Sequence, residues 1–239
     1  MSSEPKEKII SFLDPRSPYA EAFRTLRTNL SFSGVDKPYR TILITSTFPS
    51  EGKSSTCANL GVVMAQAGQR VIILDCDLRK PTQHKKFNLT STLGVTNIVV
   101  ADMKLDQVAQ STEIENLHVV TSGPIPPNPS ELVGSKKMAA LISTVSKAYD
   151  IVLVDSPPVV TVTDASLLST LVDGVLLVVK TASTKIEMVQ ESKNLLERVN
   201  AKIIGVVLNH VDINGSSYYY QYYYYHGAVD QKRITGTAL

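Results

Sequence analysis

A short polar segment, Gly52-Lys53-Ser54, has the residue types that hold a nucleotide phosphate. In a phosphate-binding loop, backbone N–H groups surround the β-phosphate, the lysine reaches the β- and γ-phosphate oxygens and the hydroxyl binds Mg²⁺. Thr47 stands where such loops usually have their first glycine, so the strict pattern is broken there. The residues predicted to contact ATP in this loop are Ser50, Glu51, Gly52, Lys53, Ser54 and Ser55.

Three aspartates end two further apolar runs. Asp75 and Asp77 follow the run that begins at Val71, and Asp155 ends the run that begins at Ile151. Ligands bind at the carboxyl ends of parallel strands, and Mg²⁺ takes one or two carboxylates, which leaves another to accept a proton. A strand-end aspartate can also be an N-cap or a turn residue, but three of them beside Lys53 favour a site. Asp164 is assigned to a helix start and left outside it.

The segments that must position these residues alternate between apolar runs and helix-period stretches. This order predicts an α/β fold with a mostly parallel sheet and helices on both faces, as in P-loop NTPases. The expected strands cover 40–46, 70–75, 117–121, 151–155, 174–180 and 202–208. The expected helices cover 18–32, 53–67, 92–99, 135–148, 163–171 and 185–199. The proline-rich segment 126–131 is expected to be a rigid, extended loop.

Tyrosine is crowded at the C-terminal end of the chain. Seven of the ten tyrosines lie between 218 and 225, interrupted only by Gln221. Such a run cannot present one consistent face in a helix or strand, so it predicts a flexible, displayed tail. An aggregation-prone disordered tract and an adhesive arm are the alternatives. The candidate phosphate acceptors are Tyr218, Tyr219, Tyr220, Tyr222, Tyr223, Tyr224 and Tyr225.

Composition limits the remaining classes of function. The chain has 239 residues, 43% of them hydrophobic, which suits one α/β domain with tails. The formal charge of +2, without a dense basic run, gives no reason to expect a nucleic-acid partner. Cys57 and Cys76 lack metal or disulfide spacing, and every apolar run is shorter than the roughly 20 residues that cross a bilayer. We expect a cytoplasmic protein that reaches the membrane only through a partner.

These motifs together resemble the bacterial tyrosine kinases of capsule and exopolysaccharide synthesis, in the form found as a separate cytoplasmic chain. The segments that carry the resemblance are Glu21–Arg27, Pro49–Ser54, Leu74–Pro81, Gly123–Leu132, Val154–Pro158 and Tyr218–Tyr225. The resemblance implies a helical segment at 1–35, a P-loop kinase core at 36–212 and an autophosphorylated tail at 213–239. It implies a chain that transfers phosphate from ATP to tail tyrosines of a neighbouring subunit, without the fold of eukaryotic protein kinases.

The resemblance also implies roles at the site. Lys53 would neutralise the phosphates, and Ser54 would bind Mg²⁺ directly while Asp77 and Asp155 hold the metal through water. Asp75 would accept the tyrosine proton, although Asp75 and Asp77 can exchange these parts. Asn209 is a candidate for hydrogen bonding to adenine, with a strand-end turn as an equal alternative. Arg79 and Lys80 are candidates for contacting phosphate or pairing with the acids.

Assembly and partners also follow from the resemblance. Glu21, Arg24 and Arg27 would belong to the interface of a homo-oligomeric ring, an octamer in the family, whereas a solvated Glu–Arg pair is the simpler alternative. The implied partners are the cytoplasmic segment of a membrane polysaccharide co-polymerase, which activates and recruits the kinase to the inner face of the membrane, and a cognate tyrosine phosphatase. The implied outcome is regulation of capsular or extracellular polysaccharide synthesis.

Two other functions remain open at this point. A P-loop ATPase that partitions or positions cargo shares the paired acids, but such proteins carry a signature lysine where this chain has Phe48. A non-catalytic scaffold with a sticky tail would have no need for Lys53 and the three acids. Transfer of phosphate from labelled ATP to the tail separates the kinase from both.

Overall fold

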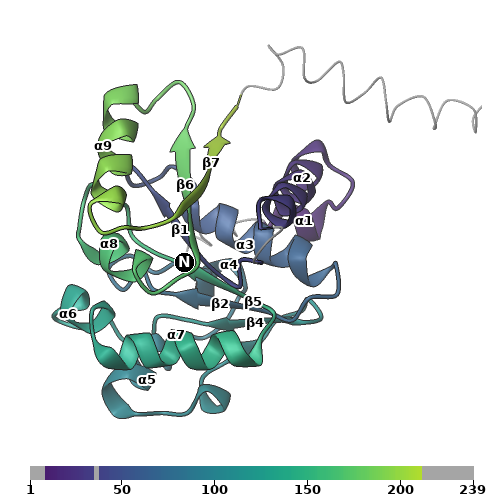
Figure 1. Ribbon diagram of the computed structural model, residues 1–239. Helices are drawn as coiled ribbons and strands as arrows, with labels where there is room; N and C mark the ends of the chain where they lie inside the picture. Colours follow the sequence, from purple (N-terminus) through teal and green to yellow (C-terminus); the bar gives the residue numbers. More distant parts are fainter. Residues whose placement is uncertain (1–8, 35–37, 212–239) are drawn as a thin grey trace, which may run out of the picture. The chain divides into compact units, whose positions relative to one another are not determined.

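The computed structural model describes residues 9–34 and 38–211 (Figure 1). These residues form a seven-stranded sheet in the order β3-β4-β2-β5-β1-β6-β7. All neighbouring strands are parallel except β3 and β4. The strands are β1 Thr41–Ser46, β2 Val71–Asp75, β3 Gln110–Ser111, β4 Leu117–Val120, β5 Ile151–Asp155, β6 Gly174–Lys180 and β7 Ile203–Asn209. The predicted fold class and all six predicted strands are confirmed.

Helices cover both faces of this sheet (Figure 1). They are α1 Ile10–Leu13, α2 Pro18–Ser33, α3 Lys53–Ala65, α4 Gln83–Lys86, α5 Val95–Ala101, α6 Pro129–Val133, α7 Lys136–Ala148, α8 Asp164–Ser169 and α9 Ile186–Glu197, with a 3₁₀ turn at Leu105–Gln107. One apolar core lies between the sheet and α5, α7, α8 and α9. The other lies between the sheet and α2 and α3. The predicted layered arrangement is therefore present.

The central strands are apolar because both of their faces are covered. Every residue of β1, β2 and β5 is buried, as expected of parallel strands between two helical layers. The edge strand β7 is different, since Val206 and Leu208 are more than half exposed. The three buried strands end side by side, which places the phosphate-loop segment after β1 beside the acids that end β2 and β5.

The proline-rich segment is not the extended loop that was predicted. Pro129 occupies the first turn of α6, which runs to Val133. Proline suits this position because its ring fixes a helical φ and its missing N–H would have no helical acceptor there. The prediction of extended geometry was wrong for this half of the segment.

The chain divides into a unit of Met1–Asn209 and a second unit of His210–Leu239, of which only His210 and Val211 are among the described residues. The predicted acceptors Tyr218–Tyr225 lie outside the described residues. Of the helices in the described ranges, none is long and apolar enough to cross a membrane.

Candidate active site

The loop between β1 and α3 adopts the backbone that a phosphate-binding loop requires. Gly52 has a φ of +94° and immediately precedes Lys53, the first residue of α3. A Cβ atom at Gly52 would lie 2.0 Å from Asn209 Nδ2, so conformation and space both select glycine here. Ser50 also has a positive φ, of 65°.

Contacts from elsewhere in the chain brace this loop. Asn209, at the end of β7, donates from Nδ2 to the Glu51 carbonyl oxygen at 2.9 Å. Buried Glu51 accepts from the Phe48 backbone N–H at 3.0 Å and from the Thr184 hydroxyl. Asn209 is therefore a loop contact in this structure, and its predicted role at adenine stays a prediction.

Thr47 explains how the loop tolerates the loss of its usual first glycine. Its side chain is fully buried, and Ser192 of α9 donates to the Thr47 hydroxyl at 3.0 Å. A threonine fits at this position because α9 supplies a hydrogen-bond partner. The departure from the strict motif is accommodated by packing against the neighbouring helix.

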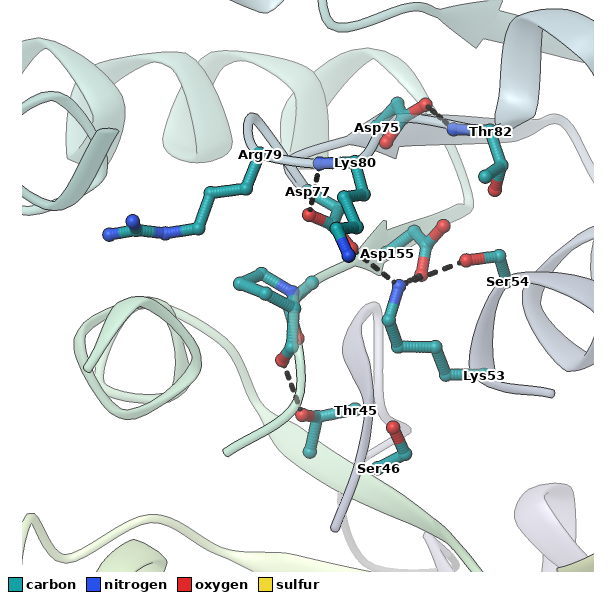
Figure 2. A network of polar contacts seen from close by, with 12 residues as sticks. Thr45, Ser46, Lys53, Ser54, Asp75, Asp77, Arg79, Lys80, Thr82 and Asp155 are labelled. Atoms are coloured by element: carbon teal, nitrogen blue, oxygen red, sulfur yellow. Dashed lines mark hydrogen bonds and ion pairs between the residues drawn. The ribbon is translucent and has the colours of Figure 1, made fainter. Parts of the chain in front are cut away.

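Lys53 lies among the three oxygen-bearing side chains that were predicted to hold Mg²⁺ (Figure 2). Its Nζ donates to Asp77 Oδ2 at 2.8 Å, to Ser54 Oγ at 3.0 Å and to Asp155 Oδ1 at 3.4 Å. Burial by itself lowers the pKa of Lys53, but the carboxylates of Asp155 and Asp77 outweigh it and raise the pKa above the ordinary value. The arrangement gathers these oxygens around one cation.

Asp75 differs from the other two acids of the site in its hydrogen bonding. It lies opposite Asp155 in the pairing of β2 with β5 and is fully buried. Its Oδ2 accepts from the backbone N–H groups of Thr82 at 3.1 Å and Gln83 at 2.9 Å, whereas its buried Oδ1 has no hydrogen-bond partner among the described residues. Burial, and then the charge of Asp155, raise the pKa of Asp75 from 3.8 to about 8.

Asp77 differs from Asp75 in that both of its oxygens are engaged. Its Oδ1 accepts from the Lys80 backbone N–H at 3.0 Å, and its Oδ2 accepts from Lys53 (Figure 2). Lys80 thus contacts the site through its backbone.

Ser55 lies at the exposed edge of the loop, where Lys86 of α4 donates to its Oγ at 2.9 Å.

The sequence interpretation missed Gln83, a fully buried residue of the site. Its Nε2 donates to Asp155 Oδ2 at 2.7 Å and to the Ser54 carbonyl oxygen at 3.1 Å. Gln83 opens the four-residue helix α4, six residues beyond Asp77 and outside any recognised motif. The only sequence signal was its position shortly after the paired acids.

Arg79 points away from the acids of the site (Figure 2). It donates from Nε to Asp164 Oδ2 at 2.9 Å and from Nη2 to Asp164 Oδ1 at 3.1 Å, with a further bond to Ser130 Oγ at 2.8 Å. Arg79 therefore does not pair with Asp75 or Asp77, so that expectation was wrong, and its contact with phosphate stays a prediction. Asp164 begins α8, as predicted, and its buried carboxylate takes Arg79 as its partner.

The helix α2 brings the three charged residues of the predicted interface onto its surface. Glu21 and Arg24 form an ion pair at 2.6 Å, which is the simpler of the two alternatives for this pair. Arg27 donates to the Val63 carbonyl oxygen of α3 at 2.8 Å. These contacts within one chain account for the three side chains in the absence of a partner, and the ring interface stays a prediction.

Comparisons with known proteins place the chain among P-loop enzymes. The ParA family model, described as NUBPL iron-transfer P-loop NTPase, matches residues 38–233. The tyrosine-protein kinase YwqD of Bacillus subtilis strain 168 is 41% identical over 207 residues, 87% of each chain.

Solved structures agree with this result. The chimerical protein CapA2B2 matches with a TM-score of 0.81 and 44% identity, over 85% of this chain and 89% of that one. The kinase domain of the Escherichia coli tyrosine kinase ETK matches with a TM-score of 0.84 and 30% identity, over 91% of this chain and 85% of that one. The septum site-determining protein MinD from Pyrococcus horikoshii, solved with Mg-ADP, is 21% identical with a TM-score of 0.61, which shows a shared fold alone.

Proposed function

Because the chain belongs to the bacterial tyrosine-protein kinases of the P-loop NTPase fold, we propose that it autophosphorylates its C-terminal tyrosine cluster in trans. The observation that carries the proposal is the presence, in one chain, of a Lys53-centred acidic site and a run of seven tyrosines at 218–225. Phosphate from ATP at the site of one subunit passes to the tail of its neighbour. The tyrosine run is thus both substrate and product.

The residues around Lys53 fit Mg²⁺ and ATP. The three side chains that surround its ammonium group, Ser54, Asp77 and Asp155, are oxygen donors of the kind that Mg²⁺ prefers. No group of three His, Cys, Asp or Glu side chains in the described residues could hold a metal by itself, so the nucleotide and water would complete the coordination. Bound Mg²⁺ neutralises charge on the transferred phosphoryl group. Lys53 then holds the phosphates through the loop that Gly52 shapes.

The free oxygen of Asp75 supports its assignment as the acceptor of the tyrosine proton. In the described part of the chain Asp75 Oδ1 lacks a partner, whereas Asp77 uses one oxygen on the Lys80 backbone and the other on Lys53. A proton acceptor needs an uncommitted lone pair. Of the two alternatives that the sequence left open, this difference favours Asp75 as base and Asp77 as metal ligand.

We further propose that the subunits form a ring through α2, and that this ring delivers each tail to a neighbouring site. The helix carries Glu21, Arg24 and Arg27 and also exposes Tyr19 and Phe32, whose exposed fractions are 56% and 71%. Head-to-tail contacts of one patch with another close into a ring when the rotation permits. The proposed activator is the cytoplasmic segment of a membrane polysaccharide co-polymerase, and a phosphatase resets the tail, which regulates polysaccharide synthesis.

Two complementary variants test transfer between subunits. Lys53→Met removes the phosphate-holding cation but keeps the tail, whereas replacing all seven tail tyrosines by phenylalanine keeps the site but removes the acceptors. Each variant alone should remain unlabelled with ATP, Mg²⁺ and the activating fragment. When they are mixed, mass spectrometry should find phosphate at Tyr218–Tyr225 of the Lys53→Met chain.

Lys193→Met is the matched control, because Lys193 pairs with Glu197 on the exposed face of α9 and should keep full labelling. A mixture without label on the Lys53→Met tail, beside a labelled wild-type chain, would exclude transfer in trans. Release of free phosphate with an unlabelled wild-type tail would instead indicate an ATPase switch.

A further inference from the structure

Gln83 connects three parts of the active site through hydrogen bonds. Its side chain donates to Asp155 at 2.7 Å and to the backbone of Ser54 at 3.1 Å, and its backbone N–H donates to Asp75 at 2.9 Å. The residue has no exposed surface. A single residue of α4 therefore contacts Ser54 of the phosphate loop and the acids that end β2 and β5.

The orientation of this side-chain amide follows from its neighbours. The two atoms it contacts, Asp155 Oδ2 and the Ser54 carbonyl oxygen, are both acceptors, so the amide must turn its NH₂ group toward them. Its Oε1 is then left buried without a hydrogen-bond partner in the described part of the chain. Such a group destabilises the folded chain unless a donor reaches it. Sites that tolerate this cost are often places where a ligand or an ordered water supplies the missing donor.

The contacts of Gln83 decide which carboxylate oxygens remain available. Asp155 Oδ2 is engaged by Gln83, so Oδ1, which accepts from Lys53, is the oxygen that a metal would meet once the lysine moves to phosphate. In the same way the Gln83 backbone engages Asp75 Oδ2, and Oδ1 has no partner within residues 9–34 and 38–211. Partners of this kind fix the orientation of metal-binding carboxylates.

We propose that Gln83 is a positioning residue that orients Asp155 for Mg²⁺, with its free Oε1 available to a water that arrives with the metal. The inference rests on the proposed function, since it requires Mg²⁺ with nucleotide at this site. Loss of an outer-shell partner of this type typically costs 10–100-fold in metal affinity or activity. The effect should appear in the metal dependence and leave metal-free nucleotide binding unchanged.

The test measures binding of a fluorescent ADP analogue to the full-length chain, with a Mg²⁺ titration and with EDTA. Gln83→Met conserves volume and removes both donated bonds, so the Mg²⁺ concentration for half-maximal enhancement of binding should rise at least tenfold. The affinity in EDTA should stay within twofold of the wild type. Gln83→Asn keeps an amide on a shorter side chain, so its half-maximal Mg²⁺ concentration should lie between those of the wild type and Gln83→Met. Affinities report only on folded chains, so partial misfolding of one variant does not hide the effect.

Gln110→Met is the matched control, because the Gln110 side chain also makes several hydrogen bonds, to Thr90 and remote from the acids. It should behave as the wild type in both titrations. An unchanged Mg²⁺ dependence in Gln83→Met and Gln83→Asn would overturn the positioning role, and so would an equal loss of affinity with and without metal. A wild-type chain that binds nucleotide without any effect of Mg²⁺ would instead refute the proposed function.

Discussion

At the scale of single residues, Gly52 and Asn209 show how backbone conformation and space combine to define the phosphate loop. Gly52 has a φ of +94°, and a side chain placed there would meet that of Asn209. Gly68, just after α3, has a similar φ of +85°, but a Cβ atom there would have no neighbour within 4 Å. An alanine at Gly68 would therefore lose stability only through its left-handed backbone, whereas an alanine at Gly52 would also lose stability through a steric clash.

We expect Gly68→Ala to lower the free energy of unfolding by about 1–2 kcal/mol, the cost of placing an L-residue in the left-handed region. Gly52→Ala should cost more and should weaken nucleotide binding at least tenfold, because its Cβ meets Asn209 Nδ2. The double variant Gly52→Ala with Asn209→Ala should return to about the stability of Gly68→Ala. Urea unfolding measures the free energy of unfolding of all three variants. Equal losses for the two single glycine variants would show that the Asn209 contact is unimportant.

The sequence predicted some residues of the site because their chemistry is carried by type and position together. Lys53, Asp75 and Asp155 each stand at a strand end or a helix start, and the sheet order brings these ends side by side. Gln83 gave no such signal, since its role depends on a short helix folding back over the strand ends. The pairing of Arg79 was not predictable because Asp164, its partner, is 85 residues away in sequence.

At the scale of elements, a buried polar network joins the segment after β2 to α6 and α8. Arg79 makes two hydrogen bonds to the Asp164 carboxylate, and Ser130 of α6 donates to the same carboxylate at 2.7 Å. Asp164 is fully buried, whereas the Arg79 side chain is 37% exposed. The network thus anchors the segment that begins with the paired acids.

Arg79→Met should lower the free energy of unfolding by about 1–3 kcal/mol, because the buried Asp164 carboxylate keeps only the Ser130 hydroxyl as donor. Adding Asp164→Asn should recover part of this loss, since the amide carries no charge. Urea unfolding provides the measurement. Arg70→Met is the matched control: its ion pair with Asp150 is half exposed, so the loss should be clearly smaller than that of Arg79→Met. Similar losses for Arg79→Met and Arg70→Met would contradict the anchoring role.

The elements that the sequence did not predict are short. The helices α1 and α4 have four residues each, and β3 has two. Segments of this length have no hydrophobic periodicity to recognise, and contacts with the rest of the fold stabilise them. The strands β1, β2 and β5 were predictable for the opposite reason, since complete burial makes nearly every residue of the run apolar.

At the scale of the whole molecule, the chemistry at Lys53 would change the charge of the chain itself. The formal charge is +2, and each phosphotyrosine adds about −1.5 to −2 charges at neutral pH. Phosphorylation of several of the seven tail tyrosines therefore makes the chain strongly acidic. We propose that the signal is the total charge of the tail, in which case no single tyrosine of the cluster needs to be indispensable.

We expect this charge to loosen the proposed ring, because phosphorylated tails repel one another and the acidic sites that receive them. Light scattering of the wild type should show a smaller assembly after incubation with ATP and Mg²⁺, whereas Lys53→Met should keep its size. The repulsion is electrostatic, and at 1 M salt the screening length falls to about 3 Å, so salt should restore the larger assembly of phosphorylated chains when the unphosphorylated Lys53→Met ring keeps its size in the same salt. A ring that keeps its size while its tails are heavily phosphorylated would contradict the mechanism. A smaller assembly that salt does not restore would point to a change of conformation as the cause in place of charge.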